Sequence, residues 1–225
     1  MDKNSLLRME WFIENYISIL DKKVLDVGSY DVNGSYKHLF PASRFDYVGL
    51  DVCDGPNVDI AVKNPYKWSE VETDSFDVVI SGQTLEHVEF FWITMSEMTR
   101  VLKCGGTMFI IVPRGFIEHR HPVDCYRFLA DGMVALARYC NLFIFHASTN
   151  LAPTRNHKKW YSHAKAHSML IALKPYSGET RIVNVNEYKM CYQNNKGFEY
   201  PLIAQRPQGF FAKAVKKIMR ILNII

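Results

Sequence analysis

The chain has 225 residues, of which 48% are hydrophobic and 22% are charged, so its composition fits one globular α/β domain and argues against wholesale disorder. Its apolar runs are too short for a transmembrane helix, and a net charge of +4 does not indicate a nucleic-acid-binding protein. Five cysteines without a Cys-x-x-Cys pair indicate neither a disulfide framework nor a zinc finger, which favours a cytoplasmic protein.

Helical and extended segments follow one another from the N-terminus. Apolar residues at helical spacing over residues 5–20 predict an amphipathic helix. Short apolar runs then predict four strands, at residues 22–28, 45–52, 58–62 and 75–84. A helix is expected over residues 86–103, ended by Gly105 and Gly106, and a fully apolar strand over residues 107–113.

The later part of the chain continues the same alternation. Residues 130–139 predict a helix, and residues 142–147 and 168–173 predict strands. Strands that are apolar along their whole length and are separated by helices predict a doubly wound, Rossmann-like α/β fold, whose ligand lies beyond the carboxyl ends of the strands. We therefore expect one domain at residues 1–174, followed by an extension at residues 175–225.

The loop after the first strand has the composition of a ligand-binding turn. Gly28 allows a ligand to approach the main chain, and Gly34 allows the loop to enter a helix. The loop lacks the dinucleotide pattern Gly-x-Gly-x-x-Gly, and its acidic Asp31 suits a ligand that carries positive charge. Asp51 ends the second strand, where a carboxylate can accept hydrogen bonds from both hydroxyls of a ribose.

Four segments resemble, in the same order, the motifs of class I S-adenosylmethionine-dependent methyltransferases: VLDVGSYDVNGSY, YVGLD, SFDVVISGQTLEHV and EMTRVLKCGGTMFIIVP. The resemblance covers about residues 20–175. It implies a seven-stranded sheet that is mostly parallel with an antiparallel last strand pair, for which residues 168–173 are the candidate. It also implies S-adenosylmethionine as the cofactor, and Gly105–Gly106 as a turn before the fifth strand.

The same resemblance implies roles for individual residues. Asp26, Gly28 and Ser29 would border the methionine part of the cofactor. Asp51 would hold the ribose, and Val52 would flank the adenine. Further cofactor contacts are implied at the adenine edge, where an amide replaces the acidic residue of many family members, and at the end of the fourth strand: Asn64, Gly82, Gln83 and Leu85.

An alcohol acceptor needs a group that takes up its proton, and a neutral imidazole suits this role near pH 7. We favour His121 as the base, because Pro122 stiffens its loop and Asp124 could orient its ring. His87, next to Glu86, is the second candidate, although this pair could instead cap the following helix. No metal is predicted.

The loop over residues 118–128 leaves two alternatives open. Its spacing could present His119, His121 and Asp124 to one metal ion, or its histidines could be structural. Its arginines offer planar forks that suit a carboxylate or phosphate. The expected acceptor-binding residues combine these arginines with histidines and an aromatic ring: Arg120, Arg127, His119, Trp160 and His163.

The run from DVNGSY to HRHPVDCYRF also resembles bacterial methyltransferases that are linked to surface-polysaccharide pathways. This resemblance implies O-methylation of a sugar, such as a Kdo residue of lipopolysaccharide. The alternatives are a methyltransferase for a small metabolite, an amine or a quinone, and a non-catalytic binding module with the same fold. Residues 209–225 predict a basic amphipathic helix, which suits the inner face of a membrane, a partner protein or the chain's own domain.

Overall fold

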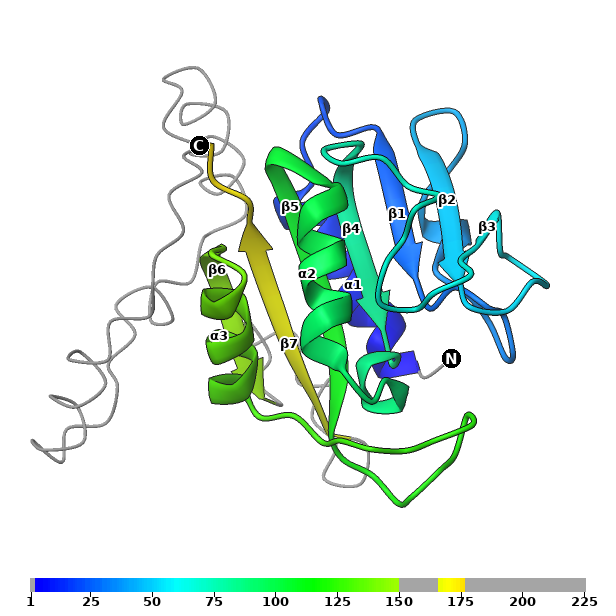
Figure 1. Cartoon of the computed structure of the whole chain (residues 1–225). Coiled ribbons are helices and arrows are strands. Elements are labelled where there is room, and N and C mark those ends of the chain that lie inside the picture. The colour runs from blue at the N-terminus through cyan, green and yellow to red at the C-terminus, as the bar shows by residue number, and fades with distance from the viewer. Residues whose placement is uncertain (1–2, 150–165, 177–225) are drawn as a thin grey trace, which may run out of the picture.

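The structure is a computed structural model that describes residues 3–149 and 166–176 (Figure 1). Several predictions therefore lie outside the described residues, namely the acceptor contacts Trp160 and His163 and the amphipathic helix at 209–225. The division of the chain at residue 174 also stays a prediction. No helix in the described ranges is long and apolar enough to cross a bilayer.

Within the described residues, seven strands form one sheet in the order β3-β2-β1-β4-β5-β7-β6. Their bounds are β1 Lys23–Val27, β2 Asp46–Asp51, β3 Ile60–Ala61, β4 Phe76–Gly82, β5 Leu102–Gly115, β6 Phe143–Thr149 and β7 Ala166–Leu173. The pairs from β3 to β5 are parallel, whereas β7 runs antiparallel to both β5 and β6. The predicted Rossmann-like sheet with an antiparallel end is confirmed.

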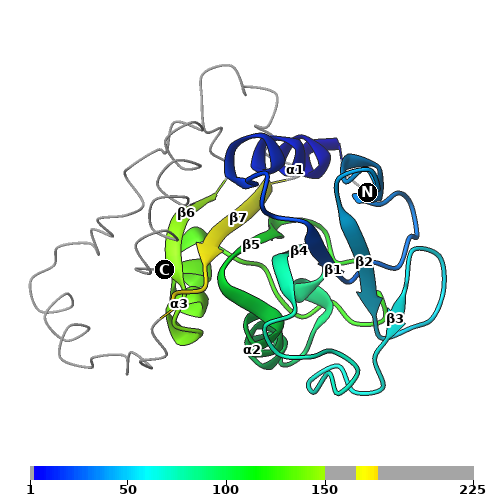
Figure 2. The same cartoon turned by 90° about the horizontal axis from the view of Figure 1, so that it is seen from above.

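The helices cover both faces of this sheet. Helix α1 (Lys3–Tyr16) lies on one face, and α2 (Phe91–Val101) and α3 (Ala130–Tyr139) lie on the other (Figure 2). On the α1 face, Phe12 stacks on Phe109 of the central strand β5, with 4.5 Å between ring centroids. Because apolar side chains are buried against both faces, the polar ligand site is confined to the strand ends.

Two predicted helical segments are shorter than expected. Between β1 and β2, where Gly34 was expected to lead into a helix, the chain forms only the 3-10 turn η1 (Lys37–Leu39). Buried Tyr36 and Phe40 attach this segment to the α1 face, so side-chain packing takes the place of a regular helix. The helix expected from residue 86 begins at Phe91, because the preceding 3-10 turn η2 (Leu85–His87) carries buried side chains into the interior.

The predicted turn at Gly105–Gly106 lies inside β5 rather than before it. The pairing of β4 with β5 shifts there, from Phe76↔Leu102 to Val78↔Thr107. The shift leaves β5 with more residues than β4 over this stretch, and Gly105 allows the strand to accommodate them with a φ of +73°, a conformation that favours glycine. The prediction that these glycines separate the helix from the strand is therefore wrong, since the strand continues through them as an irregularity.

Candidate active site

A cavity of about 1040 Å³ opens beyond the carboxyl ends of the parallel strands. The arrows of β1, β2 and β4 in Figure 1 point toward this edge, and the loop after β5 lies there too. The lining residues include Gly28 after β1, Asp51 of β2, Gln83 after β4, and Phe116 and His121 after β5. Small-molecule sites occupy about 300–1,000 Å³, so the cavity has room for a cofactor beside an acceptor.

Close packing of two loops forms the floor of the cavity at Gly28. The residue has a φ of +78°, and its N–H donates to the Leu50 carbonyl at 2.9 Å. A Cβ atom at this position would lie 2.1 Å from the Thr84 hydroxyl oxygen. Only glycine allows this approach, which leaves the main chain at the end of β1 open to the cavity.

Asp51 presents a preorganised carboxylate to the cavity. One of its oxygens accepts from the Tyr30 N–H at 3.1 Å, and the other accepts from the Val52 N–H at 2.7 Å and the Cys53 N–H at 3.3 Å. A carboxylate has about four acceptor sites, so capacity remains for a ligand hydroxyl. Since exposed Val52 lines the same wall, this end of the cavity fits a ribose beside an apolar ring.

Asp26 and Ser29 lie behind the cavity wall rather than in it, and both are buried. The Asp26 carboxylate accepts from the Tyr47 hydroxyl, which in turn accepts from the Asn57 amide at 3.2 Å. Burial raises the pKa of Asp26 to about 7, and the Asp51 charge adds to this, against the lowering effect of the Tyr47 hydrogen bond. The expected contacts of Asp26 and Ser29 with the cofactor are therefore indirect in this structure.

The other expected cofactor residues divide into two groups. Gly82 and Gln83 line the cavity, and Gln83 has a left-handed φ of +59° with its amide nitrogen 3.1 Å from His167 Nδ1. Asn64 does not line it, because its side-chain oxygen accepts from the Tyr66 N–H at 2.9 Å in a local turn. Leu85 is fully buried in the core and is not among the residues that line the cavity.

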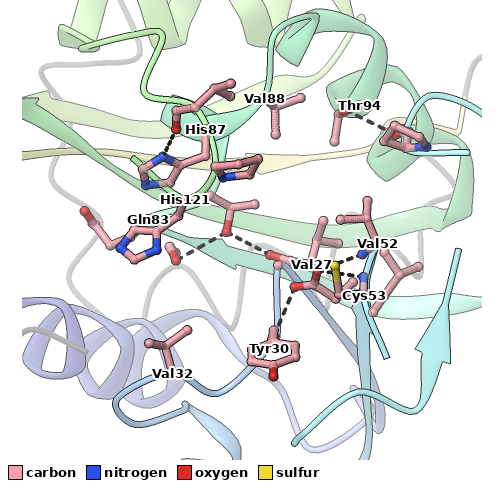
Figure 3. A pocket seen from close by; sticks show the side chains of 18 of the residues that line it. Val27, Tyr30, Val32, Val52, Cys53, Gln83, His87, Val88, Thr94 and His121 are labelled. Atoms are coloured by element: carbon pink, nitrogen blue, oxygen red, sulfur yellow. Dashed lines mark hydrogen bonds between the residues drawn. The ribbon is translucent and has the colours of Figure 1, made fainter. Parts of the chain in front are cut away.

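Three histidines gather at the other end of the cavity. The ring centroids are 4.9 Å apart for His87 and His119, 5.6 Å for His87 and His121, and 6.2 Å for His119 and His121. Figure 3 shows His87 and His121 across the cavity from Val52 and Cys53. The structure thus brings together the turn after β4 and the loop after β5, the two segments predicted from the sequence to hold the base.

The position of the His87 proton follows from its partner. His87 Nδ1 lies 2.6 Å from the Val123 carbonyl, which can only accept, so Nδ1 carries the hydrogen. Burial is the largest of the effects that lower the pKa of His87. The ring is therefore neutral near pH 7, with its lone pair on Nε2.

Glu86 is a buried acidic residue that the sequence indicates only through its place beside His87. It is fully buried, and its two carboxylate oxygens have no hydrogen-bond partner among the described residues. Burial raises the pKa of Glu86 to about 8. Its backbone carbonyl accepts from the Cys125 N–H at 2.7 Å, so the loop after β5 is attached directly to this residue. The pattern Glu-His immediately after a strand was the only sequence signal for it.

Three charged residues have other partners than the sequence led us to expect. The Asp124 carboxylate accepts two hydrogen bonds from Arg127, at 2.5 and 2.7 Å, and one from the His119 N–H at 2.7 Å, so it does not orient His121. The guanidinium of Arg127 is thus occupied inside the loop, and it holds the pKa of Asp124 well below its usual range. Arg120 points to solvent and pairs with Glu118 at 2.8 Å, outside the cavity.

Comparisons with known proteins agree with this architecture. A family model described as a methyltransferase domain matches residues 25–110. No curated protein gives a match to the sequence.

Solved structures share the fold at low sequence identity. A SAM-dependent methyltransferase from Methanosarcina mazei is 17% identical with a TM-score of 0.54, and the alignment covers 72% of this chain and 96% of that one. The 1,6-didemethyltoxoflavin-N1-methyltransferase of Burkholderia thailandensis, solved with S-adenosylhomocysteine bound, is 14% identical with a TM-score of 0.55, covering 76% and 77%. The chain therefore has a methyltransferase domain match over residues 25–110 and shares the fold of solved S-adenosylmethionine-dependent methyltransferases.

Proposed function

We propose that the chain methylates a hydroxyl oxygen of a sugar, with His121 as the base. The observation that carries this proposal is the placement of His121 in the cavity, across from Val52 and Cys53, which follow Asp51 in the chain. No hydrogen bond to its ring occurs among the described residues, so the imidazole is available to a ligand, whereas His87 is engaged by Val123.

Residues at the other end of the cavity fit the cofactor. We assign the ribose hydroxyls to Asp51, the adenine face to Val52, and the methionine part to the open main chain at Gly28. Asp26 and Ser29 support this wall from behind. When bound, S-adenosylmethionine supplies an electrophilic methyl group on a sulfonium sulfur, which leaves as a neutral thioether.

The acceptor end supplies proton transfer and positioning. As the acceptor oxygen bonds to the methyl carbon, its proton passes to the imidazole of His121, which later returns it to solvent. Gln83 and Phe116 offer an amide and a ring face beside the histidines, a combination that suits a hydroxylated ring. A proton acceptor is required because a neutral hydroxyl is a weak nucleophile.

The choice of a surface-polysaccharide sugar rests on the resemblance of the segments from DVNGSY to HRHPVDCYRF. An acidic sugar such as Kdo would have relied on Arg120 and Arg127, and both pair with carboxylates away from the cavity. We therefore propose that the site recognises a hydroxyl group and the ring of the sugar rather than an acidic group. A small-molecule acceptor is the second candidate, since the Burkholderia thailandensis structure of similar fold is named as a 1,6-didemethyltoxoflavin-N1-methyltransferase with that compound bound.

Methyl transfer can be measured directly with labelled S-adenosylmethionine and two panels of acceptors, purified bacterial polysaccharides and small metabolites. We expect label in the polysaccharide and the mass gain of one methylene group on one sugar. His121→Ala should lower turnover by about 10²–10⁴-fold while leaving cofactor affinity unchanged in calorimetry. His38→Ala, at an exposed site outside the cavity, is the matched control.

Three outcomes would contradict the proposal. Label only in small metabolites would replace the sugar acceptor. Near wild-type turnover of His121→Ala would move the base elsewhere. Absence of thermal stabilisation by either S-adenosylmethionine or S-adenosylhomocysteine would favour a binding module that does not use this cofactor.

A further inference from the structure

Potential metal ligands from two loops converge at the histidine end of the cavity. A carboxylate oxygen of Glu86 and ring nitrogens of His87 and His119 all lie within 4.8 Å of one another. Glu86 and His87 belong to the turn after β4, and His119 to the loop after β5. Two hydrogen bonds join these loops: His87 Nδ1 bonds to the Val123 carbonyl, and the Cys125 N–H donates to the backbone carbonyl of Glu86. Neither bond uses the carboxylate of Glu86 or Nε2 of His87.

Both imidazoles have a backbone carbonyl beside Nδ1. His87 Nδ1 donates to the Val123 carbonyl at 2.6 Å, and His119 Nδ1 lies 3.1 Å from the Ile117 carbonyl. Since these carbonyls only accept, each Nε2 keeps its lone pair. Asp124 Oδ2 also lies 3.6 Å from His119 Nδ1 and is fixed by Arg127. A metal-binding histidine is typically oriented in this way by a carbonyl or carboxylate behind it.

Glu86 gives an independent reason to expect a cation. Its carboxylate is fully buried and accepts no hydrogen bond among the described residues, and Oε1 lies 3.8 Å from His87 Nε2. A carboxyl group this deeply buried is ionised at little cost only when it is paired or coordinates a metal. No lysine or arginine forms an ion pair with Glu86 in the described part of the chain, so a bound cation would provide the missing partner.

We propose that Glu86, His87 and His119 bind one divalent transition-metal ion of the Zn²⁺ type, with an open coordination position toward the acceptor. Two imidazoles and one carboxylate form a ligand set used by catalytic zinc sites, whose fourth position takes water or substrate. Bonds of about 2.0–2.2 Å to one ion would place the ligand atoms about 3.4 Å apart. The ligand atoms lie within 4.8 Å of one another, so they would close by up to about 1.4 Å, which side-chain rotation can supply.

The role of this ion rests on the proposed function. His87 and His119 line the same cavity as His121, so the open position faces the space assigned to the acceptor. A hydroxyl on a divalent ion has a lowered pKa, and its proton would pass to His121. The ligand set His119, His121 and Asp124 is disfavoured, because both oxygens of Asp124 are already bonded to Arg127.

Metal binding can be measured on the full chain without any methyl acceptor. After removal of bound metal with a chelator, Zn²⁺ affinity is determined by competition with a chromophoric chelator, and the visible spectrum of the Co²⁺ form reports the ligand geometry. We expect one tight site per chain. Glu86→Gln and His119→Ala should each weaken it by at least about 100-fold while the folded content, followed by circular dichroism, is retained.

Two control variants distinguish this site from adventitious binding. Cys125→Ser removes an exposed thiol from the same loop, and His38→Ala removes an exposed imidazole elsewhere; both should keep wild-type affinity. Wild-type affinity in folded Glu86→Gln and His119→Ala, or loss of binding only in Cys125→Ser, would overturn the site. Since His121→Ala should bind the ion normally yet turn over slowly, failure of the metal site and failure of the methyl-transfer proposal give different results.

Discussion

Replacement of Asp26 by asparagine should change how the stability of the fold depends on pH. The carboxyl group has a pKa of about 7 in the folded protein, compared with 3.8 for an ordinary aspartate. Between these values the folded state keeps a proton that the unfolded state has lost, so the free energy of unfolding falls as pH rises. A difference of about 3 pKa units, at roughly 1.4 kcal/mol each, gives a loss of roughly 4 kcal/mol that is complete above about pH 7.

Asp26→Asn should remove this loss, because an amide does not titrate and can still accept from the Tyr47 hydroxyl. Urea unfolding of both proteins at several pH values from about 4 to 8 gives the comparison. The variant should gain stability relative to wild type as pH rises. Glu86 titrates in the same direction in both proteins, so its contribution cancels from the difference. Parallel pH profiles would show that Asp26 is not the buried acid the structure indicates.

Three further experiments test the cavity and its loop. Asp51→Ala should weaken S-adenosylmethionine binding by about 1–3 kcal/mol in calorimetry, and unchanged affinity in a folded variant would remove Asp51 from the site. Gly28→Ala should lower the free energy of unfolding by at least about 2 kcal/mol, because the new Cβ would meet Thr84 and the residue has a positive φ. The double variant with Thr84→Ala should regain only part of this loss, because the positive φ remains. Wild-type stability of Gly28→Ala would refute the close approach of the two loops. Arg127→Ala should speed hydrogen exchange in the loop that includes Asp124, and an unchanged exchange rate would show that the ion pair does not order it.

Hydrophobic patterning was sufficient to predict most of the fold. Helix α3 has the expected limits, and the apolar strands fall at or near the expected positions, because a strand buried on both faces needs apolar residues along its length. Local patterning did not predict η1, since the aromatic residues around it are placed by contacts with α1, far away in sequence. The glycine pair in β5 shows the same limit, because a stop signal for a helix and an irregularity in a strand have the same composition.

The site was predicted less completely than the fold. Backbone position alone brings Gly28, Asp51 and Gln83 to the cavity, and strand ends can be located from sequence. The partners of long side chains could not be predicted in this way. Arg127 looked available for a substrate, yet Asp124, only three residues earlier, occupies its guanidinium. The burial of Glu86 likewise depends on a loop that follows a different strand.

The loop after β5 connects these observations. The Val123 carbonyl of this loop fixes the proton of His87 on Nδ1, and the Asp124 carboxylate accepts from the His119 N–H. Arg127 pairs with Asp124 and keeps its carboxylate charged. These contacts leave one potential ligand atom each of Glu86, His87 and His119 within 4.8 Å of one another. Asp124 and Arg127, which were expected at the acceptor, therefore hold the conformation of this loop instead. The chemistry of this end of the cavity consequently depends on the conformation of one loop as much as on the identity of its histidines.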